Sequence, residues 1–255
     1  MFREKMVTPA IPERVYVLCK IVEKGPISSS ELKEKMEPAE LNADTSTAYF
    51  PDYRTAAEEL GLIITSDNMI SLAVDPSVIE SRQTMRKYVN GVLRKFSDGQ
   101  FYQVTHAYYM LGADALKTEK NLSNLGPVMS ELTGQKVDAM AMRAWRFWVS
   151  YLGLGYLQEM FMIPNADVFL QDVIELAGLE KGKKYSFGEF INLISPYCGI
   201  KNRRLSYGMS NGLRTLHDAG ILKMEHFLDQ KDIWTLYPLK AHPIRDTVTN
   251  ITIGG

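Results

Sequence analysis

Residues 206–222, SYGMSNGLRTLHDAGIL, place Gly208, Ser210 and Gly212 in the spacing Gly-x-Ser-x-Gly. Serine hydrolases use this spacing at a sharp turn between a buried strand and a helix, where the serine is exposed as a nucleophile. The residues that precede Gly208, GIKNRRLSY, are polar and basic and predict no such strand. We therefore expect Ser210 to be a small residue on a helix that passes close to another surface, with the flanking glycines present for the same reason.

Other residues with catalytic or metal-binding potential are sparse. The sequence shows no Walker lysine, HExxH pattern, CxxC pair or calcium loop. Cys19 and Cys198 stand among apolar residues, without a second cysteine or a histidine at metal spacing, and predict buried thiols. The histidines that follow Ser210 lie in a segment with the pattern of a helix end and a hairpin: His217, His226 and His242. The sequence predicts neither an enzyme nor a metal or cofactor site.

The composition is that of an ordinary globular protein of 255 residues, 45% hydrophobic and 23% charged, with a formal net charge of -1. This charge argues against a globally basic nucleic-acid binder but allows a local basic face. The N-terminus carries charges within its first five residues and has no apolar core segment, which predicts no secretion signal. The most apolar stretch, residues 145–163, is interrupted by Arg146 and Glu159 and is too polar to span a bilayer. We expect a cytoplasmic protein without a membrane partner.

Residues 1–75 carry the signals of three helices followed by a β-hairpin. Proline begins a helix and glycine ends one, a Ser-x-x-Glu pattern caps a helix start, and a Ser-Asp-Asn sequence turns a hairpin. In chain order these signals are Pro12 and Gly25, Ser28 with Glu31, Pro51 and Gly61, and residues 66–68. This order resembles a winged helix-turn-helix domain, in which three helices form a small core and the hairpin extends from it as a wing.

The same order returns in residues 165–240. Ser186 and Glu189 repeat the capping pattern, and a third helix ends at Gly220 within the phrase AGIL, as the earlier one ends within LGLI. We expect the hairpin of this unit to turn near residues 229–232, which leaves residues 241–255 as a C-terminal tail. Repetition of both order and spacing supports a series of similar units.

A middle unit over residues 100–164 has a weaker second helix but a convincing third helix that ends at Gly153. Residues 76–99 form a linker helix between the first and middle units. The sequence thus predicts a mainly α chain with short β-hairpins, built as two or three winged helix-turn-helix units in series.

In helix-turn-helix proteins the third helix lies in the major groove, and basic residues around it contact phosphates. The C-terminal unit offers the most basic residues of this kind, and its third helix has short side chains that suit base edges. The predicted DNA contacts are Lys183, Lys184, Lys201, Arg203, Arg204, Ser210, Asn211 and Arg214. The linker helix adds a second basic face with Arg82, Arg86 and Lys87. The resemblance implies binding to double-stranded DNA, as in a transcription regulator or an accessory subunit of a DNA-processing or defence complex.

Winged helices also serve as protein-protein modules, in which the apolar surface of the third helix or wing binds a partner. The near-neutral charge, the acidic third helix of the first unit and the aromatic residues between 145 and 161 fit this alternative. Trp145 and Trp148 are expected in the core or an interface rather than stacked on bases. The alternative is therefore an interaction module or scaffold subunit, with a protein partner or a homo-oligomer and without direct DNA readout.

Overall fold

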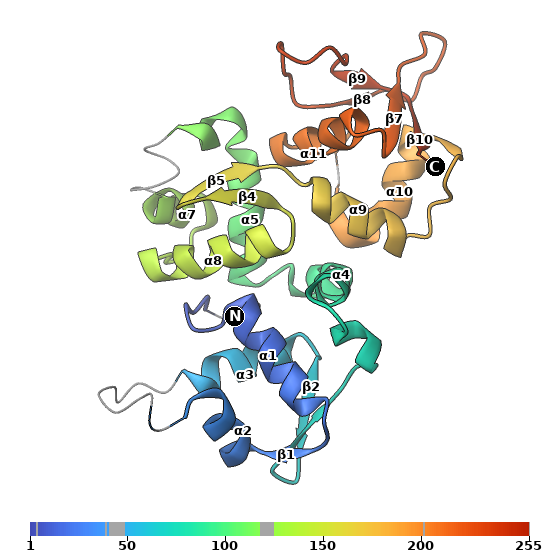
Figure 1. The fold of residues 1–255 in the computed structure, drawn as a ribbon. Coiled ribbons are helices and arrows are strands. Elements are labelled where there is room, and N and C mark those ends of the chain that lie inside the picture. Colours follow the sequence, from blue (N-terminus) through green and yellow to red (C-terminus); the bar gives the residue numbers. More distant parts are fainter. Residues whose placement is uncertain (4, 39, 41–48, 118–124, 201, 255) are drawn as a thin grey trace.

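The computed structural model describes residues 1–255 except 4, 39, 41–48, 118–124, 201 and 255 (Figure 1). Helices dominate, and the strands form small antiparallel sheets of two or three strands. This confirms the prediction of a mainly α chain with short hairpins. Within the described residues, no helix has the length and apolar character needed to cross a membrane. Helix α4 (Arg82–Val92) lies near the centre of the molecule. The other elements form an N-terminal, a middle and a C-terminal group around it.

The N-terminal group consists of three helices and a sheet with the strand order β1-β3-β2. Its elements are α1 (Pro12–Val22), β1 (Ile27–Ser28), α2 (Ser29–Met36), α3 (Phe50–Glu59), β2 (Ile63–Ser66) and β3 (Met69–Leu72). Helix α2 begins as predicted, because the Ser28 hydroxyl accepts the Glu31 backbone N–H at 3.2 Å. The β2–β3 turn also lies where predicted, with Asp67 and Asn68 at positive φ as a tight hairpin requires.

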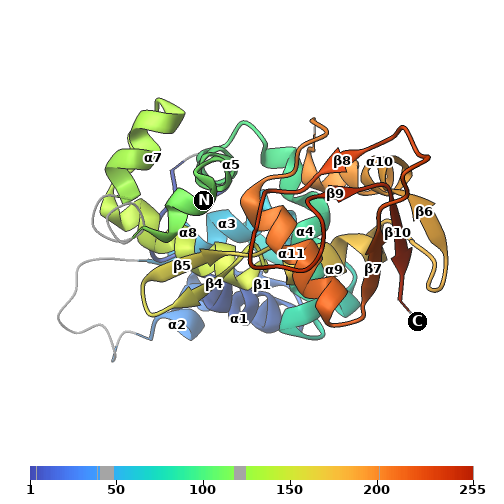
Figure 2. The ribbon, with the colours of Figure 1, turned by 90° about the horizontal axis from the view of Figure 1, so that it is seen from above.

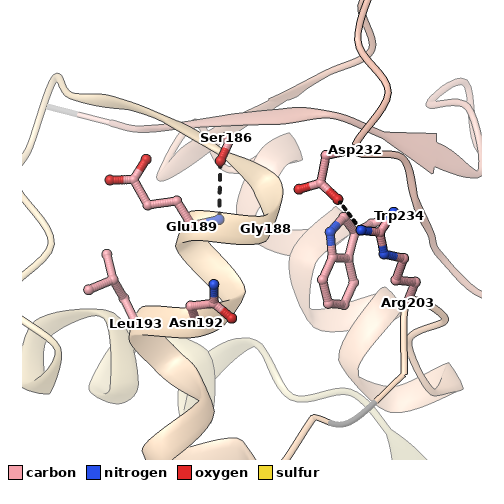
Figure 3. A pocket seen from close by; sticks show the side chains of 8 residues that line it. All are labelled: Ser186, Gly188, Glu189, Asn192, Leu193, Arg203, Asp232 and Trp234. Carbon is pink, nitrogen blue, oxygen red and sulfur yellow. Dashed lines mark hydrogen bonds and ion pairs between the residues drawn. The ribbon is translucent and has the colours of Figure 1, made fainter.

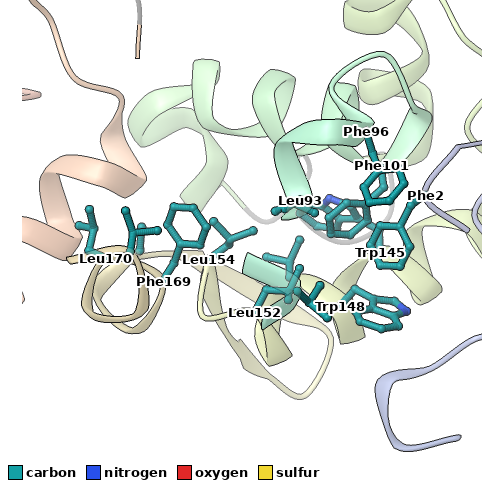
Figure 4. Close-up of a cluster of buried hydrophobic side chains, with 14 of the residues drawn as sticks. Phe2, Leu93, Phe96, Phe101, Trp145, Trp148, Leu152, Leu154, Phe169 and Leu170 are labelled. Carbon is teal, nitrogen blue, oxygen red and sulfur yellow. The ribbon is translucent and has the colours of Figure 1, made fainter. Parts of the chain in front are cut away.

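Helix α4 follows the short helix η2 (Pro76–Ile79) and leads through η3 (Leu93–Phe96) into the middle group. This group consists of α5 (Gln100–Met110), η4 (Gly112–Leu116), α7 (Leu125–Thr133), α8 (Ala139–Tyr151), β4 (Gly155–Gln158) and β5 (Phe161–Pro164). Strands β4 and β5 pair through a turn at Glu159 and Met160. Trp145 and Trp148 of α8 are fully buried, and Trp148 packs edge-to-face against Phe2 at 4.8 Å between ring centroids (Figure 4). Both tryptophans therefore belong to the core.

The C-terminal group differs from the expected hairpin and tail. It consists of α9 (Asp167–Leu176), β6 (Lys184–Ser186), α10 (Phe187–Cys198), α11 (Tyr207–Asp218), β7 (Leu222–Glu225), β8 (Trp234–Thr235), β9 (Thr247–Val248) and β10 (Asn250–Ile253). The strand order β6-β10-β7 makes β10, from the expected tail, the central strand. Residues 226–249, here called the strap, leave the sheet after β7 and fold over α11 before β10 returns to it (Figure 2). The chain does not turn directly back at residues 229–232, because the partner of β7 comes after the strap.

Helices α3, α8 and α11 end in the same way, at the glycines predicted from the sequence. Gly61, Gly153 and Gly220 have φ values of 68°, 72° and 71°, in the left-handed region that glycine adopts at low cost. The residue after each glycine donates its backbone N–H to the carbonyl five residues before it, at 2.9 to 3.0 Å. This is the Schellman arrangement of a helix C-terminus. Positions on the three helices can therefore be compared by counting back from these glycines.

A buried carboxylate joins α4 to the C-terminal group. Asp172 of α9 is 3% exposed and accepts hydrogen bonds from Arg86 Nε at 2.8 Å and Arg86 Nη2 at 3.0 Å. The Asn90 side-chain amide donates to the same carboxylate at 2.8 Å and to the Leu152 carbonyl, at the end of α8, at 3.1 Å. The carboxylate also raises the pKa of Arg86. The Asn90 side chain of α4 thus binds both the end of α8 and the Asp172 carboxylate of α9.

The other basic residues of α4 have partners as well. Arg82 pairs with Glu13 of α1, and Lys87 pairs with Glu175 of α9. The basic face predicted for the linker helix is therefore turned toward carboxylates of the chain itself.

We expect Asp172→Ala to lower the free energy of unfolding by about 3 kcal/mol, because it leaves the Arg86 guanidinium and the Asn90 amide without their buried partner. Glu175→Ala is the matched control, since it removes an exposed carboxylate that also pairs with α4, and should change stability by less than about 1 kcal/mol. Urea denaturation followed by circular dichroism measures both. Equal shifts of the two midpoints would contradict the role assigned to Asp172.

Candidate functional site

The Gly-x-Ser-x-Gly stretch lies on α11, where the helix crosses the middle group. A Cβ at Gly208 would lie 2.7 Å from the ring of Tyr109, and a Cβ at Gly212 would lie 2.6 Å from the backbone carbon of Ala166. The Gly208 carbonyl accepts the Ala166 backbone N–H at 3.0 Å. The expectation that these glycines allow a close approach is confirmed, and the surface approached belongs to the chain itself.

Ser210 is fully buried beneath the strap. Its hydroxyl accepts the backbone N–H of Tyr237 at 2.8 Å. His217, two helix turns further on, accepts the Met224 backbone N–H through Nδ1 at 3.0 Å and so faces β7. Among the described side chains, none that could act as a base is hydrogen-bonded to Ser210. The arrangement therefore lacks the activation that a serine nucleophile needs.

The Asn211 side chain forms a hydrogen bond with the edge of the β4–β5 sheet. Its amide donates to the Pro164 carbonyl of β5 at 3.1 Å, beside the Tyr108 hydroxyl, which donates to the Met162 carbonyl at 2.6 Å. In the two three-stranded sheets, β1 and β6 pair with the corresponding edges of β3 and β10. Side chains of α5 and α11 thus take the hydrogen bonds that a third strand makes in the other groups, and the half-buried Asn211 is engaged with β5 of its own chain.

Arg214 is 2% exposed and pairs with a carboxylate of the chain itself. One guanidinium nitrogen, Nη2, donates to the Tyr237 carbonyl and to the Asp246 carboxylate, both at 2.9 Å. Burial lowers the pKa of this guanidinium, while Asp246 acts in the opposite direction. Because Asp246 lies 32 residues further along the chain, it is not evident from the local sequence as the partner.

The strap is held over α11 mainly by Tyr237. The Tyr237 ring packs edge-to-face against Tyr207 at 5.0 Å between centroids, and its hydroxyl accepts the Ala113 backbone N–H at 3.2 Å. Leu236 beside it is fully buried. Together with Ser210 and Arg214, these contacts cover the outer face of α11. Sequence reasoning missed this segment, because no local pattern indicates that residues 226–249 return to α11.

The remaining predicted DNA contacts are exposed but mostly paired. Lys183 pairs with Glu180 at 2.7 Å, and Lys184 pairs with Glu225 at 2.8 Å and lies over the Phe227 ring. Hydrogen bonds from Lys184 and Lys223 lower the pKa of Glu225. Lys201 lies outside the described residues.

Arg203 and Arg204 precede α11, and Arg203 lines an open hollow of about 510 Å³ (Figure 3). Both side chains are exposed, and Arg203 pairs with Asp232 at 3.1 Å. The Asp232 carboxylate also lies against the first turn of α10, since a Cβ at Gly188 would be 2.1 Å from it. The positive end of α10 favours an anion there. Asp232 of the strap thus lies beside two of the groups that could attract a phosphate, the Arg203 guanidinium and the first turn of α10.

The described residues offer little other chemistry. None of their His, Cys, Asp and Glu side chains form a group of three or more that could hold a metal ion. Cys19 is buried and Cys198 partly buried, and burial raises the pKa of both thiols, to about 12 for Cys19. Neither is therefore a reactive thiolate near neutral pH.

Comparisons of this chain with protein-family models, with curated proteins and with solved structures give no match.

We expect Gly212→Ala to lower the free energy of unfolding by about 2 kcal/mol, because the added methyl group meets the backbone of residues 166 and 167. Gly91→Ala in α4 is the matched control. Its methyl group would be 3.5 Å from the flexible Leu176 side chain, so the better helix propensity of alanine should leave stability unchanged or raise it by up to about 1 kcal/mol. Thermal unfolding of both variants tests this, and a stabilised Gly212→Ala protein would disprove the close packing of α11.

Proposed function

We propose that the three groups are winged helix-turn-helix units, two of them complete and the middle one lacking its first strand. The order of elements supports this, because the N-terminal and C-terminal groups both run helix, strand, helix, helix and two further sheet strands, apart from the short strap strands β8 and β9. In both groups the last strand lies between the other two, as β1-β3-β2 and β6-β10-β7. The shared ends of α3, α8 and α11 support it further.

We propose that this chain is a protein-protein interaction module or scaffold subunit. The observation that carries this proposal is that the strap covers α11, the helix that would have to enter the major groove. Ser210, Asn211 and Arg214, which were predicted to contact DNA, are all engaged with other parts of the chain. Arg54 of α3 is also paired, with Glu58 at 3.2 Å. A protein that reads DNA would keep these groups accessible to bases and phosphates.

DNA binding is a second candidate, favoured by the exposure of Arg203 and Arg204 at the start of α11. In this case the two arginines would contact phosphates at the edge of the C-terminal group, and base readout by α11 would require the strap to move.

We expect no retarded complex of the full chain with duplex DNA at about 50 mM salt, where phosphate contacts are strongest, and none at about 200 mM. Electrophoretic mobility shift measures this. A complex that weakens steeply with salt would contradict the interaction-module proposal and support the second candidate. In that case the double variant Arg203→Ala, Arg204→Ala should reduce the slope of log affinity against log salt by about one unit for each arginine that binds a phosphate. The matched control Lys183→Ala, Lys184→Ala should then change it less, because both lysines already have carboxylate partners.

A further inference from the structure

The strap covers one face of α11 in the C-terminal group, whereas the corresponding face of α8 in the middle group is exposed. Tyr207, Ser210 and Arg214 stand thirteen, ten and six residues before Gly220, and these positions fall on one side of an α-helix. The same positions before Gly153 of α8 are Met140, Arg143 and Phe147, here called the α8 face.

On α11 each of these positions contacts the strap at Tyr237. The ring at the first position packs against the Tyr237 ring, the second accepts the Tyr237 N–H, and the third binds the Tyr237 carbonyl and a carboxylate. The chain thus shows which kind of segment fits this side of the helix. This segment presents one aromatic ring from Tyr237, and the carboxylate of Asp246, from further along the strap, lies beside it in space.

The α8 face has no such cover from the described chain. Met140 is 61% exposed and Phe147 37% exposed, and Arg143 is exposed and makes no ion pair with any described residue. The cause is the connection between the strands, because β4 and β5 are joined by two turn residues whereas β7 and β10 are separated by the strap. On α3 the corresponding positions that the structure describes are Pro51 and Thr55, which are less apolar and tolerate exposure.

We propose that the α8 face binds an extended segment of a partner protein that carries an aromatic side chain and a carboxylate. The aromatic ring packs on Met140 and Phe147, which provide a thioether and a ring for that contact. The carboxylate pairs with the Arg143 guanidinium, whose planar donors suit a bidentate contact. This inference rests on the proposed function and names the surface and the partner chemistry.

Selection from a phage-displayed library of random peptides, with the folded full chain as bait, tests the proposal. The selected peptides should share an aromatic residue and an Asp or Glu. Their affinity, measured by fluorescence anisotropy, should fall about tenfold or more with Phe147→Asp and with Arg143→Glu, as for the removal of an interface hot spot. Replacing the peptide carboxylate with lysine should restore binding to the Arg143→Glu protein.

Leu228→Asp is the matched control, since it places the same charge on another exposed apolar residue, 87% exposed in the strap, and should leave affinity unchanged. Peptides that bind equally well to both α8 variants would overturn the inference but leave the interaction-module proposal standing. Failure to select any peptide would also overturn it, and steeply salt-dependent DNA binding in addition would remove the proposed function as well.

Discussion

The buried carboxylate of Asp172 is the interaction on which the arrangement of α4, the middle group and the C-terminal group depends. A carboxylate that loses water must find charged or polar partners, and here they come from Arg86 and Asn90 of α4. Asn90 also binds the end of α8 through the Leu152 carbonyl. Any other orientation of α9 relative to α4 would leave a charge or an amide unpaired in the interior. This penalty favours one arrangement more strongly than apolar contacts alone, which tolerate sliding.

The position of α11 follows from that arrangement. Once α9 is fixed, α11 must pass the start of α9 and the Tyr109 ring at a distance that only glycines allow, which explains Gly208 and Gly212. Close packing turns one side of α11 inward, and the strap covers much of the other. The buried Arg214 guanidinium then requires a carboxylate partner, which the partly exposed Asp246 supplies. The basic residues of α4, and Arg203 and Arg214 beside and on α11, thus pair with carboxylates of the chain itself.

The sequence predicts the parts of this fold that depend on near neighbours. The serine caps at Ser28 and Ser186 and the stop glycines of α3, α8 and α11 involve atoms only a few residues apart, so their patterns are local. The pairing of β7 with β10 is not local, and the expected hairpin failed because its second strand lies beyond the strap. The partners of the predicted DNA contacts are hard to predict from the sequence for the same reason. The basic residues are visible in the sequence, but several of the groups that engage them come from distant segments.

The place of β10 in the chain also sets the order in which the molecule can assemble. Strand β6 is finished at Ser186, whereas its neighbour in the sheet begins at Asn250. Closing such a long loop costs conformational entropy before any pairing compensates for it. During synthesis the N-terminal and middle groups can therefore form first, while the C-terminal sheet waits for its central strand. Until that strand arrives the strap has no second anchor, so it can close over Ser210 and Arg214 only after residues 250–253 have been synthesised.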